Sequence, residues 1–213
     1  MSNSITKDDF ARMIAGAASA IREQHAMLSE LDCAAGDGDH GSTMLRTMDR
    51  LEAAFAPGSP EDLKTCLKDA GWSVLGVDGG ASSSLLGVFF GGMADAADDE
   101  LIVLFEAGLS ALRKQTKAQP GDKTMMDALV PAVLAIRAAA DQEKSTSEAL
   151  HDAALAAHAG ADATRNMTAR HGRAKFLGEK TRGHADPGAT SVSLLFEGFD
   201  KSWSNWKGEA GNA

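Results

Sequence analysis

Apolar residues recur at intervals of three and four along almost the whole chain, which is the spacing of one buried helix face. The first run extends from Phe10 to Leu28, and Thr6 is its expected N-cap. Later runs lie at 44–55, 63–74, 85–93, 101–112, 126–136 and 192–206, and an alanine-rich run follows residue 148. No segment shows the strict alternation of a half-buried strand. The sequence therefore predicts an all-α bundle whose methionine and aromatic stripes form the core.

Two helix starts have a specific signal. Ser145 and Glu148 have the spacing of a capping box in front of an alanine-rich run. Ser59 followed by Pro60 is expected to start the third helix, since proline favours the first helical position. With 213 residues, the chain is long enough for one well-packed domain, which we expect to span residues 1–213.

Charge and composition exclude several classes of protein. The net charge is −9 and no long cluster of Lys and Arg is present, so no nucleic-acid partner is expected. No apolar run approaches the length of a membrane span, and the first residues lack the features of a secretory signal. Cys33 and Cys66 have no metal-binding or redox spacing and are expected to be free thiols. These features are typical of a cytoplasmic protein without a membrane partner.

Glycine and polar residues collect in four segments between the predicted helices, at 31–44, 76–84, 118–127 and 170–191. In an up-and-down bundle, alternate loops lie at the same end. Because loops held by a rigid scaffold often carry function, the four segments are expected to converge on one site.

The segment "LDCAAGDGDHGSTM" at 31–44 combines three glycines with Asp32, Asp37 and Asp39. Its G-x-G-x-x-G spacing lacks the preceding strand of a dinucleotide fold. An EF-hand is excluded because Gly41 and Met48 would occupy two of its ligand positions. The segments "GDKT" and "GEKT" are not P-loops, since each places an acid before the lysine.

Three carboxylates in one glycine loop repel one another unless a cation lies between them. The alternative is a solvated turn in which the carboxylates point apart. Oxygen ligands favour Mg²⁺ or Ca²⁺, and Mg²⁺ typically also binds substrate phosphates. The segment "DGGASSS" at 78–84 offers free N–H groups and hydroxyls at a predicted helix start, where an anion is favoured. Together, the two segments predict a metal–phosphate site.

The segment "HGRAKFLGEKTRGHADPGATS" at 171–191 is long for a connection between helices, and such loops are often functional. Phe176 and Leu177 favour an ordered cover over the site, and Arg173, Arg182 and His184 are candidates to contact phosphate. Asp186, Pro187 and Gly188 form a predicted turn into the last helix, suited to contact a base or ribose.

The motifs "GDGDHGSTM", "GGAS…GVFF", "PGDKTMMDALVP" and "GRAKFLGEKTRGHADPGATS" resemble the nucleotide-binding L subunit of dihydroxyacetone kinase. They lie in the order of that family and span residues 31–195. The chain resembles a free-standing L subunit, so no fused dihydroxyacetone-binding domain is expected. The family "GGAS" motif usually continues with Gly-Pro, whereas Ser83 and Ser84 follow here, and members linked to the phosphotransferase system (PTS) often carry Asn at the position of Thr43.

The resemblance implies an antiparallel barrel of eight helices that holds ADP or ATP in the loops at one end. It implies two Mg²⁺ ions bound by Asp32, Asp37 and Asp39. Nucleotide contacts are implied for His40, Gly41, Ser42, Thr43, Ala81, Ser82, Met125, Arg173, Asp186, Pro187 and Gly188. No residue of this chain is assigned as general acid or base, because the substrate-side residues are expected on a separate K subunit.

The resemblance leaves the phosphoryl supply open. In PTS-linked systems the ADP stays bound and is rephosphorylated by a phosphocarrier subunit, and this mode is favoured here. The alternatives are a subunit that exchanges ATP and serves another keto-sugar such as erythrulose, or a non-catalytic, nucleotide-loaded sensor that binds a transcription regulator.

Overall fold

The computed structural model describes residues 4–34, 36–78 and 80–210, and within these ranges the fold is all-α. The helices are α1 (Lys7–Cys33), α2 (His40–Ala54), α3 (Leu63–Leu75), α4 (Ala81–Met93), α5 (Leu101–Gln115), α6 (Met126–Asp141), α7 (Thr146–Ala163) and α8 (Pro187–Ala210), with 3₁₀ helices η1 (Thr164–Asn166) and η2 (Arg173–Thr181) between the last two. In this part of the chain, β-pairing is limited to one isolated bridge between Ser4 and Glu100. The predicted fold class is confirmed.

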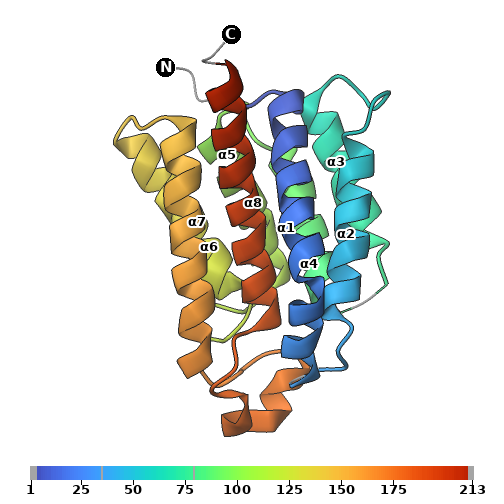
Figure 1. Ribbon diagram of the computed structural model, residues 1–213, viewed down its shortest axis with the longest axis vertical. Coiled ribbons are helices and arrows are strands. Elements are labelled where there is room, and N and C mark those ends of the chain that lie inside the picture. Colours follow the sequence, from blue (N-terminus) through green and yellow to red (C-terminus); the bar gives the residue numbers. More distant parts are fainter. Residues whose placement is uncertain (1–3, 35, 79, 211–213) are drawn as a thin grey trace.

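The α-helices form an antiparallel ring in which each helix packs on its neighbour in the chain. The ring is closed by α8, which packs along α1 (Figure 1). The connections α1–α2, α3–α4, α5–α6 and α7–α8 therefore lie at one end of the barrel. They contain the four segments in which the sequence concentrates its glycine and polar residues.

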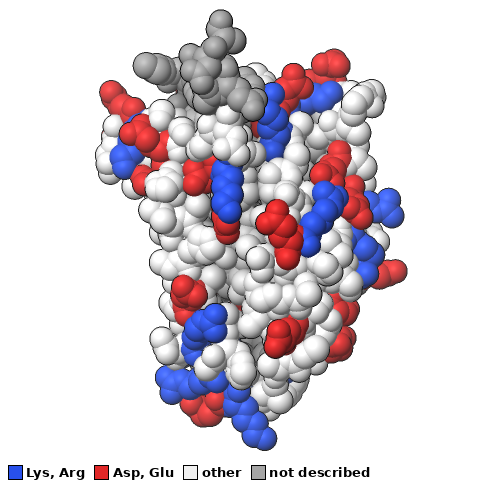
Figure 2. All heavy atoms as spheres, viewed as in Figure 1, with Lys and Arg blue, Asp and Glu red and all other residues white. Residues whose placement is uncertain are grey.

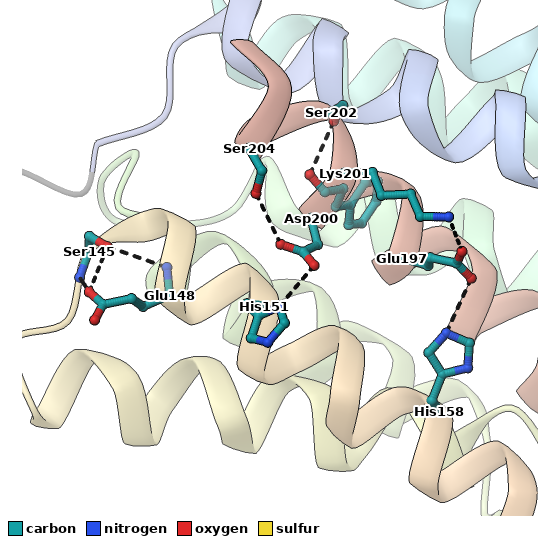
Figure 3. Close-up of polar contacts among 10 residues, drawn as sticks. Ser145, Glu148, His151, His158, Glu197, Asp200, Lys201, Ser202 and Ser204 are labelled. Atoms are coloured by element: carbon teal, nitrogen blue, oxygen red, sulfur yellow. Dashed lines mark hydrogen bonds and ion pairs between the residues drawn. The ribbon is translucent and has the colours of Figure 1, made fainter. Parts of the chain in front are cut away.

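Caps decide where several helices begin. Thr6 caps α1 in a capping box with Asp9, as predicted for Thr6. The predicted capping box of Ser145 and Glu148 is also present at the start of α7 (Figure 3). The predicted start of the third helix at Ser59–Pro60 is wrong, because α3 begins at Leu63, where the Asp62 carboxylate accepts a hydrogen bond from the Thr65 N–H.

Aromatic rings fill the interior of the barrel. Phe10 of α1 packs edge-on against Phe90 of α4, and Phe105 of α5 contacts Phe196 and Phe199 of α8, with centroid separations between 5.7 and 6.3 Å. These side chains are almost completely buried, as are Met13 of α1 and Met44 and Met48 of α2. The prediction that the methionine and aromatic stripes form the core is confirmed.

Helices α1 and α8 approach closely because a glycine of each faces the other. A Cβ atom on Gly198 would lie 2.4 Å from the Cα and N atoms of Ala17, and one on Gly16 would lie 2.3 Å from the Gly198 carbonyl oxygen. These distances leave no space for any side chain at either position. The contact fixes the distance between α1, which ends in the acidic segment, and α8, which begins at the predicted turn.

Helices α7 and α8 are linked on their outer side by ion-pairing groups (Figure 3). His151 Nδ1 lies 3.1 Å from an Asp200 carboxylate oxygen, and His158 Nε2 lies 3.2 Å from Glu197, which also pairs with Lys201. These contacts link α8 to α7, which is its other neighbour in the ring besides α1.

Acidic and basic side chains are interspersed over most of the visible face, but Lys and Arg gather at the end that carries the η2 segment (Figures 1 and 2). Among the described residues, we find no helix with an apolar stretch sufficient to span a lipid bilayer. The two cysteines are free thiols, as predicted, with Cys66 buried and Cys33 exposed.

Candidate functional site

A cavity of about 320 Å³ opens at the loop end of the barrel. Its wall includes residues from all four glycine-rich segments, so the predicted convergence is present in the structure. The predicted site residues that line it are Asp32, Asp39, His40, Ala81, Ser82, Met125, Arg173, Asp186, Pro187 and Gly188. The fold thus assembles one pocket from residues more than 150 positions apart.

The three aspartates of the first segment lie together at the edge of this pocket, where Asp32 and Asp39 line the wall and the exposed Asp37 lies just outside it. Each of Asp32, Asp37 and Asp39 offers a carboxylate oxygen within 4.8 Å of the other two. A Cβ on Gly36 would lie 2.2 Å from Asp32 Oδ1, and Gly38 has a positive φ of 75°, so both glycines are required for this loop shape. The solvated turn with carboxylates pointing apart is therefore not the observed arrangement.

Electrostatics in the trio agree with a cation site. Burial raises the pKa of Asp39, and the charges of Asp37 and Asp32 raise it further. The pKa of Asp37 is lowered, chiefly by hydrogen bonds from Arg173. Asp32 Oδ2 is buried and has no hydrogen-bond partner among the described residues. A divalent ion would give this oxygen a partner and neutralise the crowded charges, so the donor set fits Mg²⁺.

The N-terminus of α4 forms another part of the pocket wall. Gly80 is its N-cap and supplies no side chain, so the first N–H groups of the helix remain available for an anion. Ser82 lines the pocket beside them. The buried Ser83 instead donates to the Gly80 carbonyl at 3.3 Å, and Ser84 is exposed outside the pocket wall. The two serines that depart from the family motif therefore leave this anion site open.

His40 begins α2 and lines the pocket from a buried position. Its Nε2 lies 3.2 Å from Ser191 Oγ, and burial lowers the pKa of the imidazole. The ring is consequently neutral at pH 7 and suited to give or accept one hydrogen bond.

The next three residues of the motif lie outside the pocket wall. Gly41 faces α1, and a Cβ there would lie 1.9 Å from the His25 carbonyl oxygen. Ser42 Oγ donates to the Asp39 carbonyl at 2.8 Å, and the buried Thr43 accepts from Arg46. In this structure, Gly41 therefore allows α2 to pack closely on α1, while Ser42 and Thr43 form hydrogen bonds within the first turns of α2.

Lys123 is a buried residue that the sequence did not single out. Its Nζ donates to the carbonyl oxygens of Thr164 and His184 at 2.6 and 2.5 Å, and burial lowers the pKa of the ammonium group. Its positive φ of 61° is unusual for a lysine. Nearby, Asp127 accepts from the N–H groups of Gly121 and Thr124. Lys123 thereby ties the α5–α6 loop to both ends of the α7–α8 connection.

The predicted turn at Asp186, Pro187 and Gly188 is present and leads directly into α8. The Asp186 carboxylate caps this helix by accepting from the Ala189 N–H at 2.7 Å, and burial raises the pKa of this carboxyl group to about 7. A Cβ on Gly188 would lie 3.5 Å from Met125 Cβ, so these two residues form adjacent parts of the wall. The turn and Met125 therefore give the pocket wall a partly apolar patch.

Residues 170–186, here called the cover, lie at the lower end of Figure 1, and several of them line the pocket. Arg173 reaches the acidic loop and forms a two-pronged ion pair with Asp37. Arg182 instead donates to the Asn166 carbonyl, and His184 lies at the pocket wall. The Phe176 ring is 81 % exposed on the outer side, so it does not help to close the pocket.

Three comparisons relate this chain to known proteins. Residues 34–201 match the family model described as the DAK2 domain. The chain is 39 % identical over 182 residues to ADP-binding subunit DhaL of PEP-dependent dihydroxyacetone kinase 1 from Listeria innocua, which covers 83 % of this chain and 86 % of the relative. It is 36 % identical over 177 residues to the corresponding DhaL subunit of Escherichia coli, covering 80 % and 84 %.

A solved structure shares the fold. The crystal structure of the dihydroxyacetone kinase from C. freundii in complex with AMP-PNP and Mg²⁺ superimposes with a TM-score of 0.70 at 26 % identity. The match covers 90 % of this chain and 33 % of that longer chain. The present fold therefore corresponds to about one third of that kinase.

Proposed function

Because this chain belongs to the DAK2 domain family, we propose that it is the ADP-binding subunit of a dihydroxyacetone kinase. It would deliver a phosphoryl group to dihydroxyacetone, or a related keto-sugar, held on a separate K-type subunit. The observation that carries this proposal is the pocket itself, whose wall combines carboxylates of the clustered acidic trio with the uncapped N-terminus of α4. The two groups bind opposite charges, as a metal–polyphosphate ligand requires.

Each part of the pocket has a role in this proposal. Asp32, Asp37 and Asp39 would hold magnesium, with two ions as the expected number. Magnesium supplies charge neutralisation on the phosphates, which phosphoryl transfer needs more than covalent help from the protein. The α4 N-terminus and Ser82 would orient the phosphates by N–H and hydroxyl donors.

The remaining wall would hold the nucleoside. Met125 and the Asp186–Gly188 turn offer apolar surface and backbone groups against which a base and ribose can lie. His40 is neutral and placed beside the acidic trio, so it can hydrogen-bond phosphate without adding charge. No side chain in the pocket is assigned as general base, and proton transfer is attributed to the K-type partner.

The names of the two relatives support a PEP-dependent supply of phosphoryl groups. We therefore propose that ADP remains bound to this chain and is rephosphorylated in place by a PTS phosphocarrier subunit. A K-type subunit and this phosphocarrier are then the expected partners, in a cytoplasmic complex.

The nucleotide content of freshly purified protein tests this proposal. We expect ADP at close to one equivalent, retained through gel filtration and released after chelation of divalent ions. ADP that exchanges freely with added ATP would instead favour direct use of ATP. Reconstitution with a K-type subunit, dihydroxyacetone and a phosphoryl donor should then yield dihydroxyacetone phosphate. No product from a nucleotide-loaded protein would favour the non-catalytic sensor of a transcription regulator.

A further inference from the structure

The ion pair between Arg173 and Asp37 joins two segments that are 136 residues apart in the chain. Both guanidinium Nη atoms donate to Asp37, one to each carboxylate oxygen, and the Nη2–Oδ1 distance is 2.9 Å. This two-pronged geometry is the strongest form of an Arg–carboxylate contact. The pair nevertheless lies at the surface, since the side chains of Arg173 and Asp37 are 58 % and 51 % exposed.

The guanidinium lies in the space between the two halves of the proposed ligand site. On one side it contacts Asp37 of the acidic trio. On the other side, Arg173 Nη2 is 4.0 Å from the position that a Cβ on Gly80 would occupy, at the N-terminus of α4. A positive group therefore already stands where a metal ion and its phosphate would have to fit.

Three glycines lie at bends of the cover. Gly172, Gly178 and Gly183 have positive φ angles of 62°, 55° and 90°, and a Cβ at any of them would meet no atom within 4 Å. Its base is anchored, because Arg170 and His171 both contact the Asp122 carboxylate.

Beyond the Asp122 contacts, the outer run at 173–178 makes few polar contacts with the rest of the protein. Among the described residues, its hydrogen bonds and ion pairs to groups outside the cover are those from Arg173 to Asp37. Loss of this single pair would leave the outer run without a polar attachment to the acidic loop.

We propose that Arg173 is an electrostatic latch: in the metal-free protein its guanidinium takes the place of a divalent cation at Asp37 and holds the cover on the acidic loop. Metal binding at the trio displaces it, which releases the cover and frees the guanidinium for a phosphate of the incoming nucleotide. This inference rests on the proposed function, because it assumes that the trio binds magnesium.

The competition has a direct thermodynamic consequence. Both oxygens of Asp37 are engaged by Arg173, and a guanidinium beside the trio repels a second cation. Any free energy that the latch contributes to the metal-free state must be lost when the metal binds. Removing the latch should therefore strengthen metal binding in the absence of nucleotide, whereas an arginine that serves only the nucleotide would not affect it.

The test is a calorimetric titration with Mg²⁺ alone, using nucleotide-free wild-type protein, Arg173→Ala and Arg182→Ala. Arg182 is the matched control, since it lies on the same cover but hydrogen-bonds Asn166 and pairs with Glu179. We expect Arg173→Ala to bind Mg²⁺ about threefold to fivefold more tightly, a modest gain because the ion pair is exposed to solvent. Arg182→Ala should match the wild type. Equal or weaker Mg²⁺ binding by Arg173→Ala overturns the latch.

Hydrogen exchange of residues 172–183 provides a readout that is independent of affinity. In the wild type, Mg²⁺ alone should speed exchange in the cover, and Mg²⁺ with ADP should slow it again. In Arg173→Ala the exchange should already be fast without metal and should change little when Mg²⁺ is added. Unchanged exchange in the wild type on adding saturating Mg²⁺ also overturns the latch.

The two proposals fail in different ways. If wild-type protein binds Mg²⁺ and ADP but Arg173→Ala gains no affinity for the metal, the latch alone is wrong. If the wild type binds neither ligand while its circular dichroism shows a folded helical protein, the proposed function is wrong and the latch falls with it.

Discussion

The contact between α1 and α8 makes Gly198 a sensitive position for a stability test. In a Gly198→Ala variant the new methyl group would lie 2.4 Å from the Cα and N atoms of Ala17 and 2.5 Å from the Gly16 carbonyl carbon. All three are backbone atoms, so no side-chain rotation can relieve the overlap. The two helices would have to move apart.

The size of the effect follows from these distances. Carbon atoms reach optimal contact at about 3.5–4.0 Å, so α1 and α8 must separate by about 1 Å. Overpacking of this kind costs about 1–3 kcal/mol. The higher helix propensity of alanine would return up to about 1 kcal/mol. We expect a net loss of about 1–2 kcal/mol, which corresponds to a decrease in Tm of about 2–8 °C for a chain of this length.

The assay is thermal and urea unfolding followed by circular dichroism. Gly91→Ala is the matched control, because Gly91 also lies inside a helix but its added methyl group would meet Gly71 Cα at an ordinary 3.5 Å. That variant should be as stable as the wild type or slightly more stable, since only the propensity effect operates. A Gly198→Ala protein as stable as Gly91→Ala would refute the packing argument.

Three further predictions concern the pocket. Asp39→Asn should weaken Mg²⁺ binding at least tenfold by calorimetry while raising the Tm of metal-free protein, because it removes a carboxylate that Asp37 and Asp32 crowd. Burial raises the pKa of Asp186 in the folded protein to about 7, whereas the ordinary value of an aspartate in the unfolded chain is 3.8. The contribution of Asp186 to the free energy of unfolding is therefore present below pH 4 and is lost as the pH rises to 7. Asp186→Asn keeps a capping residue and should therefore gain stability relative to wild type between pH 4 and pH 7 in urea unfolding; a constant difference would contradict this. Lys123→Met leaves the carbonyl groups of Thr164 and His184 without their hydrogen-bond donor. It should lower the free energy of unfolding by about 2–3 kcal/mol in urea unfolding, and it should weaken ADP binding in calorimetry.

Most of the helices could be predicted from the sequence because the local helix signals agree with the tertiary packing. The spacing of apolar residues identified the helices, and the caps at Thr6 and Ser145 are those observed. The start of the third helix was misplaced because two signals compete there. Proline at 60 is compatible with a helix start, but the Asp62 carboxylate satisfies the Thr65 N–H and fixes the first turn.

The sequence predicted the groups of residues that form the site better than it predicted the contacts between them. Glycines between aspartates indicated a crowded carboxylate loop, and the structure gathers those carboxylates as expected. The role of Lys123 was not visible, because its partners are backbone carbonyls that have no sequence signature. The pairing of Arg173 with Asp37 depends on how the cover folds back over the barrel, which no local pattern specifies.

The closure of the ring by α8 against α1 places the start of α1 and the end of α8 side by side, at the pole of the barrel opposite the pocket (Figure 1). A tether attached at that pole would not obstruct the pocket mouth. The same architecture is therefore compatible with being carried as one module of a longer polypeptide, and a tag or surface linkage placed there should leave ligand access undisturbed. Opening the ring at the α2–α3 loop and joining the two adjacent ends offers a route to a rearranged chain with the same barrel.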